Sequence, residues 1–286
     1  MLQQRSAAHG TDPRSVGLYH LLHSAGSPQG GPALVDSTAN ARIVDANVDV
    51  IGAFAMDPSL AGRVIAVTGG FGVLGRALAD VLVGAGARAA LLDVAPAPSN
   101  LPAGTFALGE VDLGDATAAR AAFDQVAQRC GGLDGLVNVA GGFRWEKLED
   151  GRIETWDRMF ALNVRTAVLA SQAALPHLLA RGQGRIVNVG AAAASQAALG
   201  MGAYAAAKSG VARLTEAMAE EFKDRGITVN AVLPSILDTA ANRAEMPDAD
   251  PTRWVQPQAL ARVVLFLLSG NAAPITGALI PVRGRV

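Results

Sequence analysis

Tyr204 and Lys208 carry the side chains best suited to move a proton, in the run Tyr204-Ala-Ala-Ala-Lys208. Residues at i and i+4 lie on the same face of a helix, so the phenol and the ammonium are expected to be neighbours. A nearby positive charge favours tyrosinate and lowers the pKa of the tyrosine toward working pH. The pair is therefore predicted to act as a general acid or base.

A glycine-rich turn after a short apolar strand is the second chemical feature. Gly70, Gly72 and Gly75 have the spacing G-x-G-x-x-G between a predicted strand at 64–68 and a predicted helix at 74–83. Such glycines allow a tight turn, close approach of the backbone to a pyrophosphate, and close packing of helix on strand. The helix N-terminus then faces the phosphates, so the turn predicts a dinucleotide-binding loop.

Asp93, at the end of the second predicted strand, bears on which dinucleotide binds. A carboxylate there accepts hydrogen bonds from the adenosine ribose hydroxyls and repels a 2′-phosphate. No Lys or Arg lies between Thr68 and Gly75, so NAD(H) is predicted in preference to NADP(H). Arg76 is the counter-argument, because its guanidinium could reach a phosphate.

Strands that are apolar on both faces alternate with helices from about residue 56 to the C-terminus. This pattern is typical of a parallel sheet covered by helices on both sides. We predict an α/β fold with a Rossmann-type doubly wound parallel sheet of about seven strands in a single domain. Strands are expected at 64–68, 89–93, 135–139, 185–189, 228–233 and 278–282, and helices at 74–83, 116–128, 155–180, 203–224 and 257–268. Pro176 is expected to distort the longest helix locally.

Residues 1–55 differ from the rest, with Gly/Ser/Pro clusters and no sustained helical period. They are predicted to be a poorly structured N-terminal extension, or upstream sequence read as protein, before a domain at 56–286. Cys130 is the only cysteine, which excludes an intramolecular disulfide and a cysteine metal cluster and fits a cytoplasmic location. No metal site is expected.

The overall charge and hydropathy narrow the choice of partners. The formal net charge of −1 gives no electrostatic case for nucleic acid or an acidic membrane surface. No apolar run reaches the roughly 18 residues of a membrane span. A small-molecule substrate is therefore the expected partner.

In this order and spacing, the motifs resemble those of the short-chain dehydrogenases/reductases over residues 60–284. The turn Asn138-Val-Ala-Gly141 is similar to the family's Asn-Asn-Ala-Gly, and Asn163 in Leu-Asn-Val matches a helix asparagine. The resemblance implies catalytic roles for Tyr204, Lys208 and Asn163. It implies cofactor contacts at Thr68, Gly70, Phe71, Gly72, Val73, Leu74, Gly75, Asp93, Asp112, Leu113, Asn138, Ala140, Gly141, Tyr204, Lys208, Pro234, Ile236 and Thr239.

The resemblance also implies individual roles. Tyr204 would exchange a proton with the substrate, Lys208 would bind the nicotinamide ribose, and Asn163 would link Lys208 to solvent through water. Thr239 would hold the carboxamide, while Asp112 would contact the adenine, with an ordinary turn acid as an equal alternative. A homodimer or homotetramer through the helices at 155–180 and 203–224 is implied as well.

The residue thirteen positions before Tyr204 departs from the family pattern. Family members have a serine there that polarises the substrate carbonyl, and this chain has Ala191. The loss of one such donor costs about 10²–10³ in rate for carbonyl chemistry. Ser195 is the nearest downstream hydroxyl but comes four residues late. Either the activity has decayed or the substrate needs no serine.

Quinonoid dihydropteridine reductases also have alanine at this position, and two stretches resemble theirs, at 139–143 and 237–254. That resemblance implies a conjugated ring that accepts hydride with a single proton donor, although Asn163 follows the ordinary family pattern. Arg243, within the second stretch, is expected to form an ion pair with a nearby acid rather than to bind substrate. The residues expected around the substrate, with packing as an equal alternative for the aromatic and methionine side chains, are Ala191, Phe143, Trp145, Met201 and Trp254.

The predicted function is hydride transfer between NAD(H) and a small carbonyl-like or quinonoid substrate. Two alternatives remain open from the residues alone. One is a general ketone or alcohol dehydrogenase that tolerates Ala191, and the other is a non-catalytic NAD(H)-binding sensor.

Overall fold

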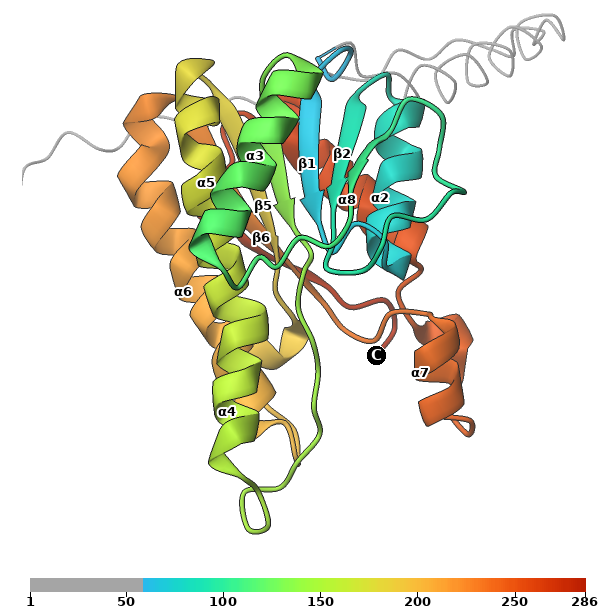
Figure 1. Cartoon of the computed structure of the whole chain (residues 1–286). Helices are drawn as coiled ribbons and strands as arrows, with labels where there is room; N and C mark the ends of the chain where they lie inside the picture. The colour runs from blue at the N-terminus through green and yellow to red at the C-terminus, as the bar shows by residue number, and fades with distance from the viewer. Residues whose placement is uncertain (1–58) are drawn as a thin grey trace, which may run out of the picture. The chain divides into compact units, whose positions relative to one another are not determined.

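Seven parallel strands form one sheet in the order β3-β2-β1-β4-β5-β6-β7 (Figure 1). The structure is a computed structural model that describes residues 59–286, so the extension predicted at 1–55 lies outside the described residues. The strands are β1 (Val64–Thr68), β2 (Arg88–Leu92), β3 (Phe106–Leu108), β4 (Gly135–Asn138), β5 (Gly184–Val189), β6 (Ile227–Pro234) and β7 (Leu279–Val282). The predicted α/β class with a parallel sheet is confirmed.

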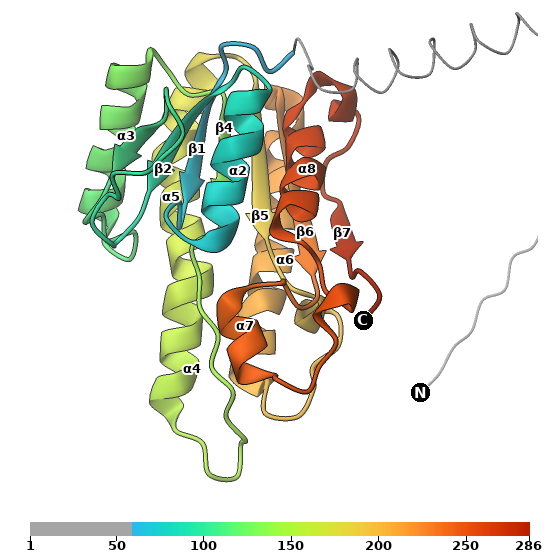
Figure 2. The ribbon, with the colours of Figure 1, turned by 90° about the vertical axis from the view of Figure 1, so that its right-hand side faces the viewer.

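Helices cover both faces of the sheet (Figures 1 and 2). Ile65 and Val67 of β1 pack into the core on one face, while Val64 and Ala66 pack into the core on the other. This follows from the alternation of side chains along a strand, and it explains why the four residues of β1 before Thr68 are all apolar. The helices on the first face are α2 (Val73–Gly84) and α8 (Pro257–Leu268), and those on the second are α3 (Ala116–Cys130), α5 (Thr166–Ala180) and α6 (Gly202–Phe222).

The strand order reverses at β1, which pairs with β2 on one side and β4 on the other. Ligands of open α/β sheets bind at such a switch point, outside the carboxyl ends of the strands. The register places Thr68, Asn138 and Asn188 in one row at this edge. The fold therefore directs attention to the loops that follow β1, β4 and β5.

The structure differs from the predicted elements in three places. The predicted helix at 155–180 consists of α4 (Ile153–Phe160), a π-helical turn η1 (Ala161–Arg165) and α5 in succession. The distortion expected at Pro176 lies instead in that π turn, and α5 continues through the proline. Two short elements, β3 and α7 (Ala240–Glu245), had no predicted bounds because so few residues show no clear period.

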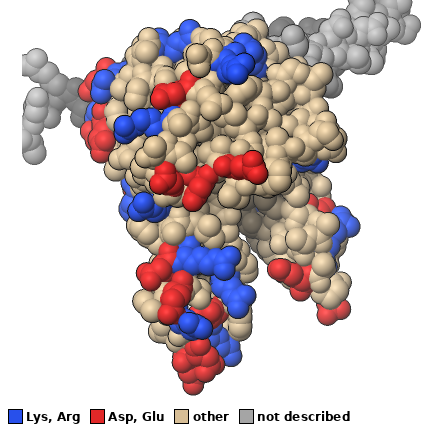
Figure 3. All heavy atoms as spheres, in the orientation of Figure 1, with Lys and Arg blue, Asp and Glu red and all other residues tan. Residues whose placement is uncertain are grey.

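Acidic and basic side chains lie close together around α4 on the face seen in Figure 3. This mixture of signs agrees with the near-zero net charge of the sequence. Within residues 59–286, no helix is both long and apolar enough to cross a membrane.

Candidate active site

The glycine loop joins β1 to α2, and the reason for glycine differs from one position of the loop to another. A Cβ atom on Gly75 would lie 2.5 Å from the Gly69 carbonyl oxygen, and one on Gly70 would lie 2.6 Å from Leu91 Cβ. Both positions therefore need glycine for packing within the protein. A Cβ on Gly72 would come no closer than 3.4 Å to any other atom, an ordinary contact. Gly72 thus leaves room at the start of α2, which fits a phosphate group close to the backbone.

Asp93 connects this loop to the end of β2. Its Oδ2 accepts a hydrogen bond from the Phe71 backbone nitrogen at 3.0 Å, and its Oδ1 accepts one from the Ala95 nitrogen at 3.1 Å. Each carboxylate oxygen has a second lone pair, so Asp93 can still accept from ribose hydroxyls. Arg76 reaches the segment after β2, where its Nη2 donates to Asn100 Oδ1 at 2.5 Å. The structure therefore places both Asp93, which favours NAD(H), and Arg76, which could favour NADP(H), near the carboxyl end of β2.

The ends of β1, β4 and β5 are tied together by buried polar side chains. Thr68 Oγ1 accepts hydrogen bonds from the backbone nitrogens of Val139 and Ala140, at 3.0 and 3.1 Å. Asn138 Nδ2 donates to Asn188 Oδ1 at 2.9 Å and to Ser171 Oγ at 3.1 Å. Thr68 and Asn138 therefore fix the loop at 139–142. Asn188 and Ser171 were not identified from the sequence, because their role depends on the strand register.

Asp112 and Leu113 follow β3 in a tight turn. Asp112 Oδ1 accepts a hydrogen bond from the Gly114 nitrogen at 2.8 Å, and the Leu113 side chain is buried. These contacts are those of an ordinary turn acid and its packed neighbour. An adenine contact at Asp112 stays a prediction.

Tyr204 and Lys208 lie in the first turns of α6, as their spacing predicts. Lys208 is buried, its Nζ donates to the Val189 carbonyl oxygen at 2.8 Å, and this nitrogen lies 5.9 Å from the centroid of the Tyr204 ring. Desolvation lowers the pKa of Lys208 to about 8. Burial raises the pKa of Tyr204 to about 12, so the expectation that the ammonium lowers it was wrong for the resting protein. Loss of solvation around the phenol is the cause of this rise.

Asn163 lies in the π turn, and its side chain is hydrogen-bonded to backbone atoms. Its Nδ2 donates to the carbonyl oxygens of Gly142 and Met159 at 3.0 and 2.9 Å, and its Oδ1 accepts from the Gly142 nitrogen at 3.2 Å. A Cβ on Gly141 would lie 2.5 Å from Asn163 Oδ1 and 3.5 Å from Lys208 Nζ. The structure thus brings Asn163, Gly141 and Lys208 together. π turns of this kind occur often at functional sites.

Ala191 follows β5 two residues after the carbonyl that Lys208 contacts, and its side chain is buried. A methyl group there can donate no hydrogen bond. Ser195, the nearest downstream hydroxyl, is exposed at the end of the 3₁₀ turn η2 (Ala192–Ala194). This exposed position gives no support for Ser195 in the place of the missing serine.

The candidate pocket walls separate into two groups. Phe143 and Trp145 are about half exposed, at 49% and 51%, and the Phe143 ring stands perpendicular to that of Tyr204 with centroids 4.9 Å apart. Trp145 packs on Gly200, where a Cβ would overlap the indole, and Met201, the residue after Gly200, is partly buried. Trp254 is only 6% exposed, which favours its packing alternative.

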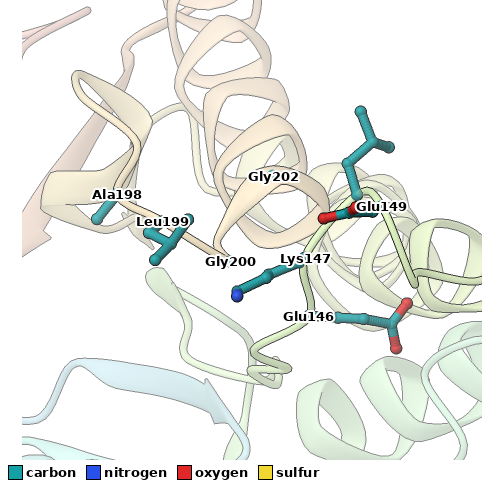
Figure 4. Close-up of a pocket in the computed structure, with 8 residues that line it drawn as sticks. Glu146, Lys147, Glu149, Ala198, Leu199, Gly200 and Gly202 are labelled. Carbon is teal, nitrogen blue, oxygen red and sulfur yellow. The ribbon is translucent and has the colours of Figure 1, made fainter.

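An open hollow of about 380 Å³ lies next to the Trp145 contact (Figure 4). Residues 146–149 line one side, and 198–200 with Gly202 line the other. Glu146, on the first side, is held by the Arg152 nitrogen and the Thr155 hydroxyl at 2.7 and 2.8 Å. None of the three predicted catalytic residues lines this hollow.

The segment after β6 carries the remaining predicted cofactor residues. Pro234 ends the strand, the Ile236 carbonyl oxygen accepts from the Val255 nitrogen at 2.9 Å, and Thr239 Oγ1 caps α7 by accepting from the Asn242 nitrogen at 3.1 Å. Cofactor contacts at these residues stay predictions. Arg243 donates to both carboxylate oxygens of Asp238, at 2.6 and 2.8 Å, so the expected ion pair is confirmed.

Comparison with known proteins gives a consistent result. A family model described as short chain dehydrogenase matches residues 63–250. The 2-(S)-hydroxypropyl-CoM dehydrogenase 3 of Xanthobacter autotrophicus is 34% identical over 250 residues, covering 80% of this chain and 98% of that protein. A protein of the same organism named inactive 2-(S)-hydroxypropyl-CoM dehydrogenase 2 is 36% identical, covering 72% and 98%. The structure of carveol dehydrogenase from Mycobacterium avium in complex with NAD has a TM-score of 0.70 at 28% identity, covering 79% of this chain and 98% of that one.

Proposed function

The chain belongs to the short-chain dehydrogenase/reductase family of oxidoreductases, and from that premise we propose that it transfers hydride between NAD(H) and a small carbonyl-like or quinonoid substrate. The observation that carries the proposal is the assembly of Tyr204, Lys208 and Asn163 beside the loop at 141–143. A tyrosine, a buried lysine and a π turn come together where the strand order predicts a ligand.

The chain has side chains and backbone that would receive each part of a dinucleotide. The space at Gly72 and the start of α2 would receive the pyrophosphate, and Asp93 would bind the adenosine ribose. Lys208 and Thr239 would hold the nicotinamide end. When bound, the nicotinamide supplies or accepts the hydride. The NAD-bound state of the carveol dehydrogenase neighbour supports this assignment, and the free acceptor capacity of Asp93 supports NAD(H) over NADP(H).

Tyr204 would give its phenolic proton to the reacting substrate atom in reduction and take it back in oxidation. Its raised pKa keeps the phenol protonated at rest, as a proton donor requires. Lys208, with a pKa of about 8, carries its charge at neutral pH. That charge would stabilise the tyrosinate that forms as the proton leaves.

Ala191 limits the class of substrate. With alanine at this position, the Tyr204 hydroxyl is the proposed hydrogen-bond donor to the reacting substrate atom, without a serine beside it. A conjugated ring that accepts hydride readily would tolerate this better than an isolated ketone. The half-exposed rings of Phe143 and Trp145 could stack on such a ring. The name of the hydroxypropyl-CoM relative favours the alternative of an ordinary secondary alcohol or ketone.

A second candidate is a protein that binds NAD(H) without turning over substrate. Ala191 and a relative that is itself named inactive favour it. The retention of Tyr204, Lys208 and Asn163 argues against it, since binding alone needs no proton donor.

The full-length protein should be assayed by NADH absorbance with quinonoid dihydropterin and with a panel of small ketones, with NADPH in parallel. Turnover of the pterin with NADH supports the quinonoid assignment and accounts for Ala191. Turnover of a ketone alone would replace it with the general dehydrogenase. Tight NADH binding without any turnover would favour the sensor.

A homodimer or homotetramer and a cytoplasmic location belong to the same proposal. Ile153, Trp156 and Phe160 form an exposed apolar stripe on α4, at 69%, 37% and 57% exposure, which supports association through this helix. Light scattering after size-exclusion chromatography measures the assembly, and a monomer at micromolar concentration would rule it out.

A further inference from the structure

Phe143 touches the proposed proton donor directly. The two rings are 4.9 Å apart between centroids, with an interplanar angle of 88°. Perpendicular aromatic pairs at this separation are favourable and restrict the ring orientation. Phe143 is 49% exposed while Tyr204 is partly buried, so Phe143 lies between the phenol ring and solvent on one side.

The backbone that carries Phe143 is held in place independently of the aromatic contact. Two hydrogen bonds join Asn163 to Gly142: the Gly142 nitrogen donates to Asn163 Oδ1, and Asn163 Nδ2 donates to the Gly142 carbonyl oxygen. Phe143 is the next residue, so its starting point is fixed relative to the π turn. Asn163 therefore supports both the active-site loop and the placement of this ring.

Resting on the function proposed above, we propose that Phe143 is a positioning residue for Tyr204, which holds the phenol ring in its productive orientation and shields it from water. This chain has Ala191 at the position of the serine that holds the reacting group in other family members. The orientation of the proton donor then depends more heavily on packing against its ring. Phe143 supplies that packing from the loop side.

The shielding has a measurable consequence for the ionisation of Tyr204. Burial raises the pKa of this residue, and the Lys208 ammonium nitrogen lies 5.9 Å from the centroid of its ring. Among the described residues, burial is the cause of the shift and none of the charged side chains in the elements packed on α6 contributes to it. These side chains are Glu154, Asp157 and Arg158 of α4, Arg165 of η1, Arg185 of β5, and Lys223, Asp224 and Arg225 of the 3₁₀ turn after α6. Removal of Phe143 admits water to the phenol, so the pKa should fall toward the value of an exposed tyrosine.

The sequence makes this testable on one residue. The chain has two tyrosines, Tyr19 and Tyr204, so Tyr19→Phe leaves Tyr204 as the single tyrosine. Carbon-13 labelling of that tyrosine and titration by NMR give its pKa in the full-length protein, with circular dichroism confirming the fold at each pH. In this background, Phe143→Ala should lower the pKa by about one unit or more, and Phe143→Leu, which keeps apolar bulk, by less.

A second readout avoids alkaline conditions. At neutral pH, the line shapes of the ring carbons report how fast Tyr204 flips, and Phe143→Ala should speed flipping roughly 2- to 10-fold. Trp145→Ala is the matched control, because Trp145 is equally exposed but packs on Gly200 instead of Tyr204. It should leave both readouts in place. The inference fails if Phe143→Ala changes neither the titration nor the flipping rate, or if Trp145→Ala changes them equally.

These measurements need no substrate, so they separate the inference from the proposed function. If Phe143→Ala changes the pKa and ring-flip rate of Tyr204 but the wild type turns over no substrate, the positioning role of Phe143 stands and the hydride-transfer proposal is refuted. Once a substrate is identified, Phe143→Ala should lower kcat and shift the pH profile of kcat/KM to lower pH. Trp145→Ala should raise KM without shifting that profile.

Discussion

Lys208 gives a prediction whose size follows from its burial. Desolvation moves its pKa from the ordinary value of 10.5 to about 8 in the folded protein. The unfolded chain therefore binds more protons than the folded one between these two values, so stability rises with pH across that window. At one pKa unit per roughly 1.4 kcal/mol, the penalty is about 3 kcal/mol at pH 7 and about 1 kcal/mol at pH 10.

The assay compares urea unfolding of the wild type with that of Lys208→Met from pH 7 to pH 10, because other groups then cancel in the difference. The free energy of unfolding of the wild type should rise relative to that of the variant by about 2 kcal/mol over this range. The variant also loses the hydrogen bond to the Val189 carbonyl oxygen, which lowers its unfolding free energy by a similar amount at pH 7 and at pH 10. Tyr204 has its pKa raised to about 12 and limits the clean window to below about pH 10, where unfolded tyrosine begins to ionise. A difference that stays flat with pH would show that Lys208 is not desolvated as described.

Three further predictions concern the substrate and the cofactor. Ala191→Ser should raise ketone turnover tenfold or more, at about the worth of one oxyanion donor, if a missing donor limits the rate; an unchanged rate in steady-state assays would remove the general ketone dehydrogenase. Gly72→Ala should keep its unfolding free energy within about 0.5 kcal/mol and weaken NADH binding in fluorescence titrations, whereas Gly75→Ala should lose about 1–3 kcal/mol of stability through backbone overlap. Tight NADH binding by Gly72→Ala would show that the phosphates do not bind at Gly72. Asp93→Ser should raise the kcat/KM ratio of NADPH to NADH about tenfold or more by removing the repulsion of the 2′-phosphate, and a ratio that already favours NADPH in the wild type would refute the assignment.

Strong local patterns account for what could be predicted from the sequence. Uninterrupted apolar strands such as Val64–Thr68 indicate a parallel sheet, and the glycine spacing needs only a strand before it and a helix after it. The range predicted for α8, which opens with Pro257 at its first position, agrees with its observed bounds. In each of these cases the information lies within a few consecutive residues.

Contacts between distant segments could not be predicted in this way. The perpendicular pair of Phe143 and Tyr204 joins a loop to helix α6 across about sixty residues of sequence, and the hydrogen bonds of Asn163 depend on a π turn that has no clear sequence pattern. The direction of the Tyr204 pKa was wrong for the same reason. The i, i+4 spacing reveals the nearby ammonium, but the loss of solvation depends on everything that packs around the ring.

Tyr204→Phe tests the central claim most directly. NADH binding and turnover should be measured side by side on the wild type and the variant, with whichever substrate the panel identifies. Loss of the phenolic proton should reduce kcat by about 10²–10⁴ and leave NADH affinity nearly unchanged, because the ring and its packing are retained. A variant that turns over substrate at the wild-type rate would show that Tyr204 is not the proton donor, and would contradict the account.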